Sequence, residues 1–465
     1  MRTIKLIVSD LHVGDGERLL DGFGERQQAA LDGLLAAAGR GVDGPMGQAE
    51  EVELILNGDC FDFLISKPHD TDGVMHVGVA VEKLSRMIAA HGPFFETLGR
   101  FVRQPGRRMT IMPGNHDMEL CFAEVREGIL EGMGMAQDDG RICFCLTPGY
   151  RPLPDVYIEH GHAYHFWCCD RSGLWAAAGQ VKTVNPQVMQ LPLEARYVQH
   201  VAYPIVMHYP YLTRFAPSLS FARQAALLCL LNPAMLAEAV EHIWELLDGG
   251  AYGWPRTGSL PLARGLEGSP IALFDQAVKA LMAFQRDAVA RVPRWREPAG
   301  KKAALQAQVR GFMEVTMLRK TLSRVSKDMD VTRALARIFR LKRAATRDSV
   351  AAGMHTVLKS DPLLRYALAG HIHTERIDAI KSGTGEQQVY LNTGGWLRQL
   401  ALPKPEEVTP KLVAWLREPD WEHMPLREVT PRHVFALVHA ADGGPSRASL
   451  CLWEDGRNGH YRVLA

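Results

Sequence analysis

The sequence predicts an α/β protein that is interrupted by a large helical insertion. Residues 1–165 alternate short β-branched runs with helical patterns, which is typical of βαβ units and a covered sheet. From about 170 to 360 the strand signal is absent and helix-like windows replace it, and after residue 363 strand-like runs return. We therefore expect a core with its first part at 1–165, an inserted helical cap at 166–362 and the second part of the core at 363–465.

In the first part of the core, four apolar runs each end in a polar cluster: TIKLIVSD, VELILNGD, RMTIMPGNHD and DVYIEHGH. Between the first of these runs lie RQQAALDGLLAAAGR and VAVEKLSRMIAAHG, whose apolar residues recur at helical spacing. Ligands of open α/β sheets bind beyond the carboxyl ends of the strands. The polar clusters therefore predict a binding site at one edge of the sheet.

The insertion and the second part of the core also contain windows that predict their helices and strands. The windows SFARQAALLCLLNPAMLAEAVEHIWELLDGG, with a Gly pair as a stop signal, and FDQAVKALMAFQRDAVARV predict helices. The runs YALAGHIH, QQVYLNTGGW, HVFALVHAA, ASLCLWEDG and HYRVLA predict strands. The charged, Pro-containing stretch 403–431 predicts a long surface loop.

Composition narrows the classes of protein that fit. Charged residues at 23% and hydrophobic residues at 47% are ordinary for a folded globular chain. No apolar run reaches the roughly 20 residues that a spanning helix needs, and the N-terminal run is too short for a secretory signal, so we expect a cytoplasmic protein, either free or peripheral to the membrane. The 8 Cys residues stand mostly in apolar contexts and read as reduced core residues. The adjacent Cys168 and Cys169 lack the second pair that a zinc site needs, which favours two small buried residues.

Charge is distributed unevenly along the chain. The segment 286–347 holds 17 Lys or Arg against 5 Asp or Glu, a net charge of +12, whereas the remaining chain carries −11. Within it, VTRALARIFRLKRAATR places Leu335, Ile338 and Phe339 on one helical face among basic residues. This pattern suits an anionic membrane surface, nucleic acid or a solvated surface helix. The window YVQHVAYPIVMHYPYLTRFAPSL predicts either an apolar cap over the site or burial against the core.

The polar clusters share the residue types of a metal centre. Five strand ends supply them: Asp10 and His12 in DLH, Asp59 and Asp62 in GDCFD, Asn115, His116 and Asp117 in GNHD, His160 and His162 in HGH, and His371 and His373 in GHIH. Two divalent cations roughly 3.5–4 Å apart need a bridging carboxylate, and imidazole together with carboxylate suits Zn, Fe or Mn. We therefore predict two divalent metal ions. No G-x-S-x-G elbow and no GKS or GKT motif points to another chemistry.

Taken in order, these five motifs resemble those of the calcineurin-like metallophosphoesterase family over residues 3–165 and 365–396. The resemblance implies a four-layer α/β/β/α sandwich. It implies one metal surrounded by Asp10, His12, Asp59 and His373, and a second metal surrounded by Asp59, Asn115, His160 and His371. It also implies that His116 is the catalytic histidine, which protonates the leaving oxygen or stabilises charge there, and that Asp117 orients or polarises it.

The resemblance leaves the substrate open. It implies a phosphoesterase acting on a phosphomonoester, phosphodiester or diphosphate bond, and the apolar cap window favours an amphiphilic or lipid-linked substrate. The alternatives are a DNA nuclease of the SbcD type, which GNHD and the basic segment fit, and a non-catalytic scaffold of the same fold. Protein Ser/Thr phosphatases carry GDxVDRG and GNHE and are disfavoured. Enzymes that split UDP-diacylglucosamine are similar in SDLH but have Arg where His116 stands.

Several residues near the motifs receive lesser roles. His162 is expected either to line the phosphate pocket or to pack locally. Asp62 is expected to support its loop through hydrogen bonds, and Asn392 in YLNTGGW to shape a tight turn without binding metal. His165 and Glu375 are expected either to contact the substrate or to occupy solvated or core positions. The more distant His69, His200 and His355 are expected to be structural or exposed.

Overall fold

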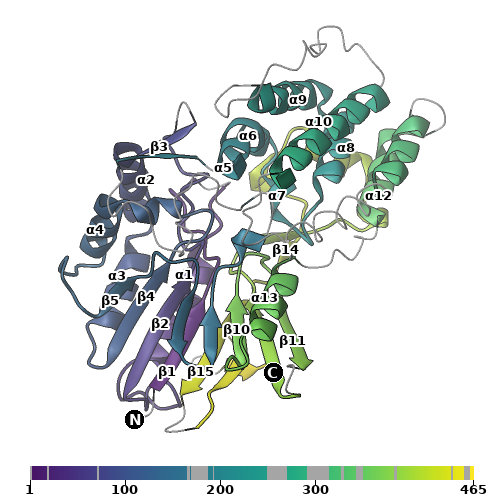
Figure 1. Cartoon of the computed structure of the whole chain (residues 1–465). Helices are drawn as coiled ribbons and strands as arrows, with labels where there is room; N and C mark the ends of the chain where they lie inside the picture. The colour runs from purple at the N-terminus through teal and green to yellow at the C-terminus, as the bar shows by residue number, and fades with distance from the viewer. Residues whose placement is uncertain are drawn as a thin grey trace.

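The protein has a mixed α/β fold with parallel and antiparallel strands (Figure 1). The computed structural model describes residues 3–17, 20–70, 73–164, 168, 187–191, 193–248, 270–290, 314–325, 329–341, 349–381, 385–440, 444–454 and 461–464. Among the helices of these ranges, none combines the length and apolarity needed to cross a bilayer.

The larger sheet contains strands from both parts of the predicted core. Its order is β17-β16-β15-β1-β2-β4-β5. The strands are β1 (Thr3–Val8), β2 (Glu51–Asn57), β4 (Arg107–Met112), β5 (Ile142–Phe144), β15 (His433–Ala440), β16 (Arg447–Trp453) and β17 (Tyr461–Val463). The pairs β1–β2, β2–β4 and β4–β5 are parallel, whereas β15 runs antiparallel to β1. The carboxyl ends of β1, β2 and β4 therefore meet at one edge.

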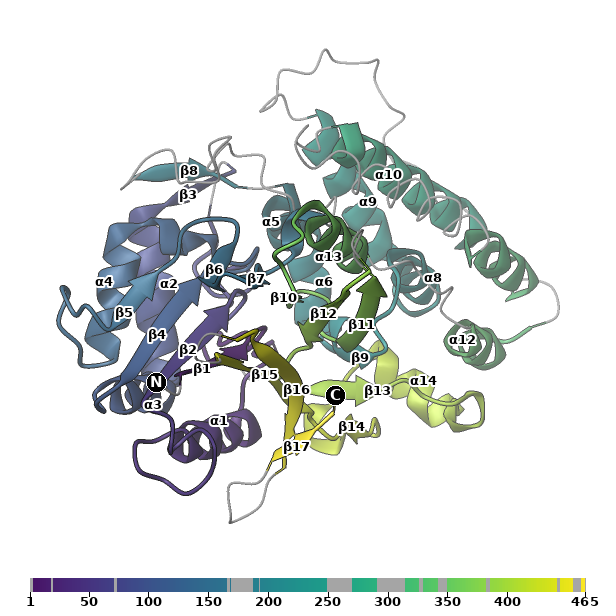
Figure 2. The ribbon, with the colours of Figure 1, turned by 60° about the horizontal axis from the view of Figure 1, so that its bottom comes forward.

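Helices cover the outer face of this sheet. They are α1 (Glu25–Ala37), α2 (Val77–Ala90), α3 (Gly92–Val102) and α4 (Ala123–Gly132), grouped beside β1–β5 in Figure 2. Alternate side chains of the strands, such as Leu6 and Leu54, join helix residues such as Leu31 and Phe94 in one apolar cluster. The predicted alternation of strands and helices in residues 1–165 is confirmed.

A second sheet packs against the other face of the first. Its order is β11-β12-β10-β7-β6, with β6 (Tyr150–Leu153), β7 (Val156–Ile158), β10 (Tyr366–Ala369), β11 (Glu375–Lys381) and β12 (Gln387–Thr393). Ile7 and Ile55 of the larger sheet lie in one buried cluster with Ile158, Leu368 and Leu391 of the smaller sheet. Because β10 is parallel to β7, their carboxyl ends also meet at one edge.

Helix α13 (Ser349–Ser360) lies on the outer face of the smaller sheet. Val350, Met354 and Leu358 pack against Ala367 of β10 and Tyr390 of β12. The last helix before the strands return therefore covers the core sheet.

The remaining helices form a separate layer near the ends of the strands, which we call the cap (Figure 1). The cap helices are α5 (Leu193–Tyr197), η3 (Val198–Ala202), α6 (Tyr203–His208), α7 (Tyr211–Arg214), α8 (Phe221–Leu231), α9 (Pro233–Asp248), α10 (Pro270–Ala290) and α12 (Val331–Arg340). The window 220–250 contains two helices, because the Pro233 nitrogen cannot donate to the preceding turn and α8 ends before Asn232. The Asn232 side chain caps α9 by accepting from Met235 N at 3.2 Å. The Gly pair at 249–250 lies outside the described residues.

The amphipathic pattern of α12 is explained by packing inside the cap. Leu335 and Ile338 are fully buried, Phe339 is nearly so, and α12 contacts α8 and α14. This apolar face is therefore covered by protein. Much of the basic segment, at 291–313, 326–328 and 342–348, lies outside the described residues, and an anionic partner there stays a prediction.

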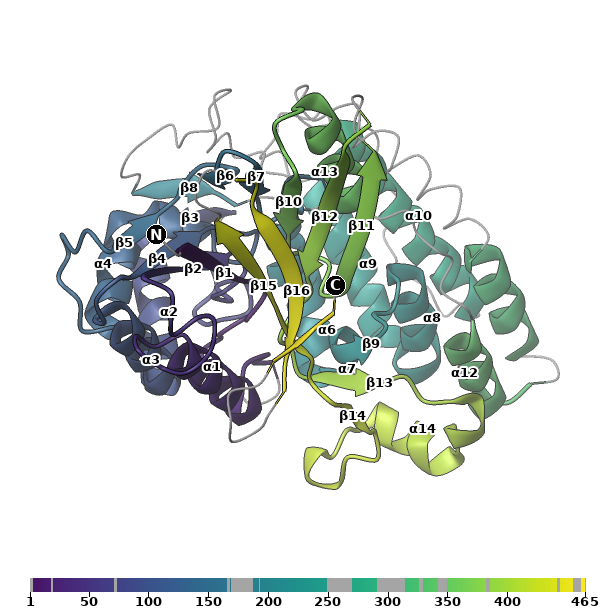
Figure 3. The same cartoon turned by 90° about the horizontal axis from the view of Figure 1, so that it is seen from below.

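The stretch 403–431, expected to be a surface loop, instead contains regular structure. It forms η5 (Pro405–Glu407), α14 (Pro410–Arg417), η6 (Trp421–His423) and β14 (Glu428–Val429). Leu412, Trp415 and Leu416 join the apolar cluster of the cap, and Figure 3 shows α14 on the same side as α12. The expectation was wrong because the apolar residues of this stretch are buried against the insertion, which its charge and prolines do not reveal.

Two short strands also occur in stretches without a strand signal in the sequence. β8 (Val188–Gln190) pairs with β3 (Val74–His76), and β9 (Phe215–Ala216) pairs with β13 (Gln399–Ala401). With two or three residues each, they are too short to show a period. Both connect the cap to the core side of the molecule.

Candidate metal centre

The polar residues that follow five strands come together at one edge of the two sheets. They follow β1, β2 and β4 of the larger sheet and β7 and β10 of the smaller one, at the ends that lie nearest the cap. Asp10, Asp59, Asn115 and His160 are buried, and His371 and His373 are partly exposed. The topology thus collects residues that are up to 363 positions apart in the chain.

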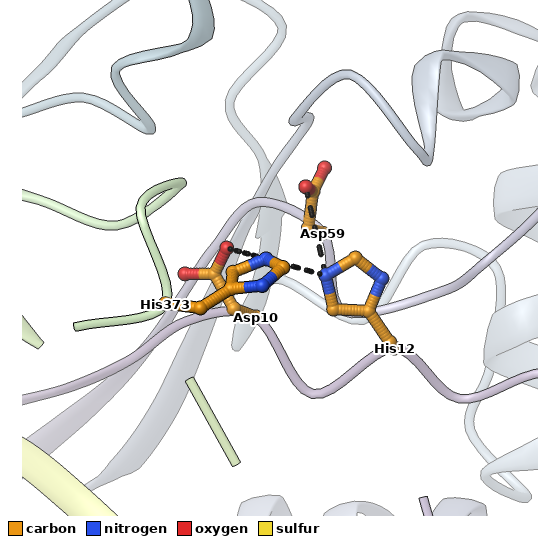
Figure 4. A group of neighbouring side chains, drawn as sticks. All are labelled: Asp10, His12, Asp59 and His373. Carbon is orange, nitrogen blue, oxygen red and sulfur yellow. Dashed lines mark hydrogen bonds and ion pairs between the residues drawn. The ribbon is translucent and has the colours of Figure 1, made fainter. Parts of the chain in front are cut away.

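The first cluster consists of Asp10, His12, Asp59 and His373 (Figure 4). Each of these side chains offers one donor atom, and the four atoms lie within 4.8 Å of one another. His12 Nε2 is 3.1 Å from His373 Nε2 and 3.8 Å from Asp59 Oδ2. His373 Nε2 is 3.4 Å from Asp10 Oδ1. Two carboxylates and two imidazoles thus point into one small volume, a donor set that suits a divalent cation.

The second cluster shares Asp59 with the first. Asp59, His160 and His371 again bring donor atoms within 4.8 Å of one another. The Asn115 amide oxygen lies 3.0 Å from His371 Nδ1. His160 Nε2 is buried 3.2 Å from Asp59 Oδ2 and makes no hydrogen bond of normal geometry to any described residue. A buried imidazole nitrogen and a carboxylate oxygen at this distance can both ligate one cation.

The far ends of the imidazole rings are anchored. His160 Nδ1 lies 2.9 Å from the Asn57 carbonyl oxygen, and His12 Nδ1 lies 2.9 Å from Asp62 Oδ2. In metal sites such outer contacts fix the tautomer and direct the free nitrogen at the ion. Both rings therefore present Nε2 to the clusters.

The backbone at the ligands is held in an unusual conformation. Five non-glycine residues in the described part of the chain have a positive φ, and all five are predicted ligands: Asp10 (54°), His12 (48°), Asp59 (51°), His371 (71°) and His373 (52°). Such left-handed conformations are uncommon for residues with a side chain, and strain of this kind concentrates at functional sites. The loops therefore hold these side chains in place at a cost in backbone energy.

Two glycines of the motifs allow the loops to approach one another. A Cβ at Gly114 would lie 2.2 Å from Asp59 Oδ1, and a Cβ at Gly58 would lie 2.5 Å from His160 Nδ1. Glycine removes both clashes. The glycines of GD and GN are thus required by close contact with ligand side chains.

His116 is held by Asp62 and not by Asp117. His116 Nδ1 lies 2.8 Å from Asp62 Oδ1, and the other oxygen of Asp62 contacts His12. The buried Asp117 carboxylate instead accepts hydrogen bonds from the backbone amides of Cys60, Phe61 and Gly114. The residue that contacts the His116 ring is thus Asp62, and the expected role of Asp117 in orienting or polarising His116 stays a prediction. Asp117 ties the GNHD loop to the GDCFD loop, and Asp62 provides more than the loop support expected of it.

The charges of the clusters perturb one another. Burial would raise the pKa of Asp59, but the imidazoles of His160 and His116 outweigh burial and hold that pKa well below its usual range. Burial lowers the pKa of His116, but Asp62 and Asp59 raise it well above its ordinary value. These contacts favour the ionised form of Asp59 and the protonated form of His116.

The other histidines singled out in the sequence lie around or outside these clusters. The His162 ring is buried, 5.5 Å from the His160 ring centroid and 6.5 Å from that of His371, so it packs beside the second cluster. His69 packs on Tyr203, His355 lies 3.1 Å from Asp378, and His200 is exposed.

Other residues singled out in the sequence lie in different parts of the fold or outside the described residues. The Asn392 side chain donates a hydrogen bond from Nδ2 to the Gly370 carbonyl oxygen and accepts one from Gly394 N at 3.0 Å, as expected of a residue that shapes a turn. Cys168 is buried in the cap, whereas His165 and Cys169 lie outside the described residues. Glu375 pairs with Arg432 at 2.8 Å beside the site.

A cavity of about 490 Å³ separates the clusters from the cap. His12, Asp62, His116 and His373 form its floor on the metal side. The cap and the adjoining loops supply mainly apolar walls: Leu20, Ile65, Val198, Ala202, Val206, Phe215, Ala216, Pro217, Ile372 and Leu397. The window 197–219 therefore contributes a lining to the site, one of the two outcomes that the sequence left open.

Two residues near the site carry no sequence motif. Glu194 of α5 accepts a hydrogen bond from Asn115 Nδ2 at 3.1 Å, which directs Asn115 Oδ1 toward His371. Arg214 of α7 lines the cavity. Both residues lie in the insertion, where no local pattern marks them. Only the way in which the cap packs brings them to the site.

The geometry brings Asp and His side chains within metal-binding distance of one another on an α/β scaffold, which is compatible with divalent metal binding. No protein-family model matches the chain, and a search of curated proteins finds no match.

Proposed function

We propose that this protein is a phosphoesterase of the calcineurin-like metallophosphoesterase type that uses two divalent cations, Mn, Fe or Zn. The observation that carries the proposal is the pair of donor clusters that share Asp59. They hold the same residues that the motif order assigns to the two metals. Two facing sheets with helices on their outer faces are compatible with the four-layer sandwich of that family.

The two cations would supply Lewis-acid chemistry, polarising a phosphoryl oxygen and lowering the pKa of water near neutrality. The residues of the chain contribute the rest. His116 lines the cavity, and because Asp62 holds Nδ1, the Nε2 nitrogen is the one available to donate a proton to the leaving oxygen. The cap limits access of bulk water to the bound ester. No side-chain nucleophile is needed.

The cavity supports hydrolysis of a small ester over the alternative of a DNA nuclease. Its volume of about 490 Å³ lies in the range of pockets that enclose small molecules, and the cap closes one side of it. The presence of every predicted ligand, and of His116, supports catalysis over a scaffolding role. Apolar walls beside the metal side support an amphiphilic substrate, free or presented at a membrane surface.

Hydrolysis of p-nitrophenyl phosphate and bis-p-nitrophenyl phosphate, with manganese and with a chelator, tests the proposal. We expect manganese-dependent release of nitrophenol from at least one ester. His371→Ala should abolish it, whereas His355→Ala, outside the clusters, should retain it. A protein that binds manganese at the clusters yet hydrolyses neither these esters nor a panel of nucleotides and lipid phosphates would contradict an enzymatic role.

A further inference from the structure

The cavity above the candidate centre carries a positive charge on its cap side. Arg214 stands at the end of α7 and lines the cavity together with the apolar residues of the cap. Its Nη2 donates to the backbone carbonyl oxygen of Asp21 at 3.0 Å. The Asp21 carboxylate is turned elsewhere, to the amides of Gly14, Gly16 and Phe23 and to His91 Nε2. The guanidinium therefore meets a neutral carbonyl where a carboxylate would be expected.

Arg214 differs in this from the other charged residues of the cavity. Arg398 pairs with Glu428 at 3.3 Å, and Glu375 pairs with Arg432 at 2.8 Å. Within the described ranges, no acidic side chain lies within ion-pair distance of Arg214. Burial and the nearby Arg398 lower the pKa of Arg214 to about 10, so the group remains charged at neutral pH. The carboxylates of Asp21 and Glu428 favour the charged form from a distance, but neither contacts the guanidinium. Burying a charge without a direct partner is costly, and an anionic ligand in the cavity offsets that cost.

We infer that Arg214 binds a second anionic group of the substrate, so that the substrate is a small molecule with a phosphate ester at one end, an apolar body and an anion at the other. This inference rests on the proposed function, because it places the ester on the metal side of the cavity. Apolar side chains line much of the same cavity and suit the body of such a ligand. The planar guanidinium suits a phosphate or carboxylate, which it can bind through two parallel hydrogen bonds.

Alkanediol bisphosphates provide the test, compared with alkyl monophosphates of the same chain length. A series of four, six, eight and ten carbons covers the unknown span between the two ends. Phosphate release with manganese gives kcat/KM for each ester. We expect the wild-type protein to prefer a bisphosphate at one or more chain lengths.

The variant Arg214→Gln should lose that preference. Its kcat/KM for the favoured bisphosphate should fall roughly ten- to hundredfold, the size expected for a lost charge-assisted hydrogen bond, while values for monophosphates stay within about twofold. Arg398→Gln is the matched control, because Arg398 lines the same cavity but is already paired; its effect should be much smaller. A preference that persists in Arg214→Gln, or an equal fall for both ester classes, would overturn the inference.

Binding of a non-hydrolysable alkane bisphosphonate separates this inference from the proposed function. Calorimetric titration should show at least tenfold weaker binding to Arg214→Gln than to the wild type. If the wild type hydrolyses no ester but binds the bisphosphonate through Arg214, the proposed function fails and the anion site stands. Equal affinities of the two proteins for the bisphosphonate would refute the anion site whatever the activity.

Discussion

Asp59 is the residue on which both donor clusters depend, because its carboxylate is the member they share. The same carboxylate accepts a hydrogen bond from His116 N at 2.8 Å through its other oxygen. It therefore connects the two clusters with the loop that carries the proposed general acid. A positive φ at Asp59 holds the side chain in this position.

Replacing this carboxylate tests its bridging role. Asp59→Asn should remove both ions, because a neutral amide is a poor bridge between two cations, and activity should fall by at least about 10²-fold. Metal analysis of the purified variant measures the loss. Asp32→Asn, which alters a surface aspartate near Arg100, is the control and should keep its metal. Full metal content in Asp59→Asn would refute the shared-ligand arrangement.

His116 should matter for chemistry and not for metal binding. His116→Ala should retain both ions while kcat falls roughly 10²- to 10⁴-fold, the usual contribution of a general acid. The effect should be smallest for esters with a good leaving group such as p-nitrophenol, which needs little protonation. Loss of metal in this variant would instead make His116 a ligand.

His69 predicts a pH dependence of stability outside the centre. Burial, and then Lys83, lower its pKa from 6.5 to about 4. The unfolded chain therefore binds a proton at higher pH than the folded one, so the free energy of unfolding should decrease as pH falls from about 6.5 to 4. Urea unfolding with a chelator present, across this range, should show a shallower decrease in His69→Phe than in the exposed control His423→Gln. Identical slopes would contradict the assignment.

At the scale of elements, the loops of the centre are fixed by a buried charge on α2. Lys83 Nζ is fully buried, 2.6 Å from Asp70 Oδ2 and 3.7 Å from Glu119 Oε1. Asp70 follows the GDCFD loop and Glu119 follows the GNHD loop. Helix α2 thus holds both loops through one ammonium group.

Removing this ammonium group should destabilise the fold. Lys83→Met leaves two buried carboxylates without their cation and should lower the free energy of unfolding by roughly 3–5 kcal/mol. Arg86→Met is the control on the same helix: its pair with Glu82 is about half exposed, and the expected cost is below about 1 kcal/mol. Chemical denaturation measures both. Equal costs would show that the buried cluster contributes no more than a surface pair.

The sequence predicts those elements whose signal is local. Strand ends carry their own ligands, so Asp10, His12, Asp59, His160, His371 and His373 are identifiable without a structure. The partner of His116 is not, because Asp117 is adjacent in sequence whereas Asp62 lies 54 positions away and is brought to His116 only by the loop geometry. Helix α14 could not be predicted, because the cap that buries its apolar face is distant in sequence. The positions of Glu194 and Arg214 at the site could not be predicted for the same reason.

At the scale of the whole molecule, the chain divides its tasks between sheets and cap. The donor groups follow five strands of the two facing sheets. The cap covers the cavity and contributes apolar side chains and Arg214 to its lining. The cap contacts the centre through the hydrogen bond of Glu194 with Asn115. Selectivity for a substrate can therefore change in the cap while the donor groups stay fixed.

Anomalous diffraction from crystals of the manganese-loaded protein tests the central claim most directly. We predict two peaks roughly 3.5–4 Å apart, one among Asp10, His12 and His373 and one among Asn115, His160 and His371, with the Asp59 carboxylate between them. A single ion, no ion, or ions bound away from these side chains would contradict the dinuclear centre.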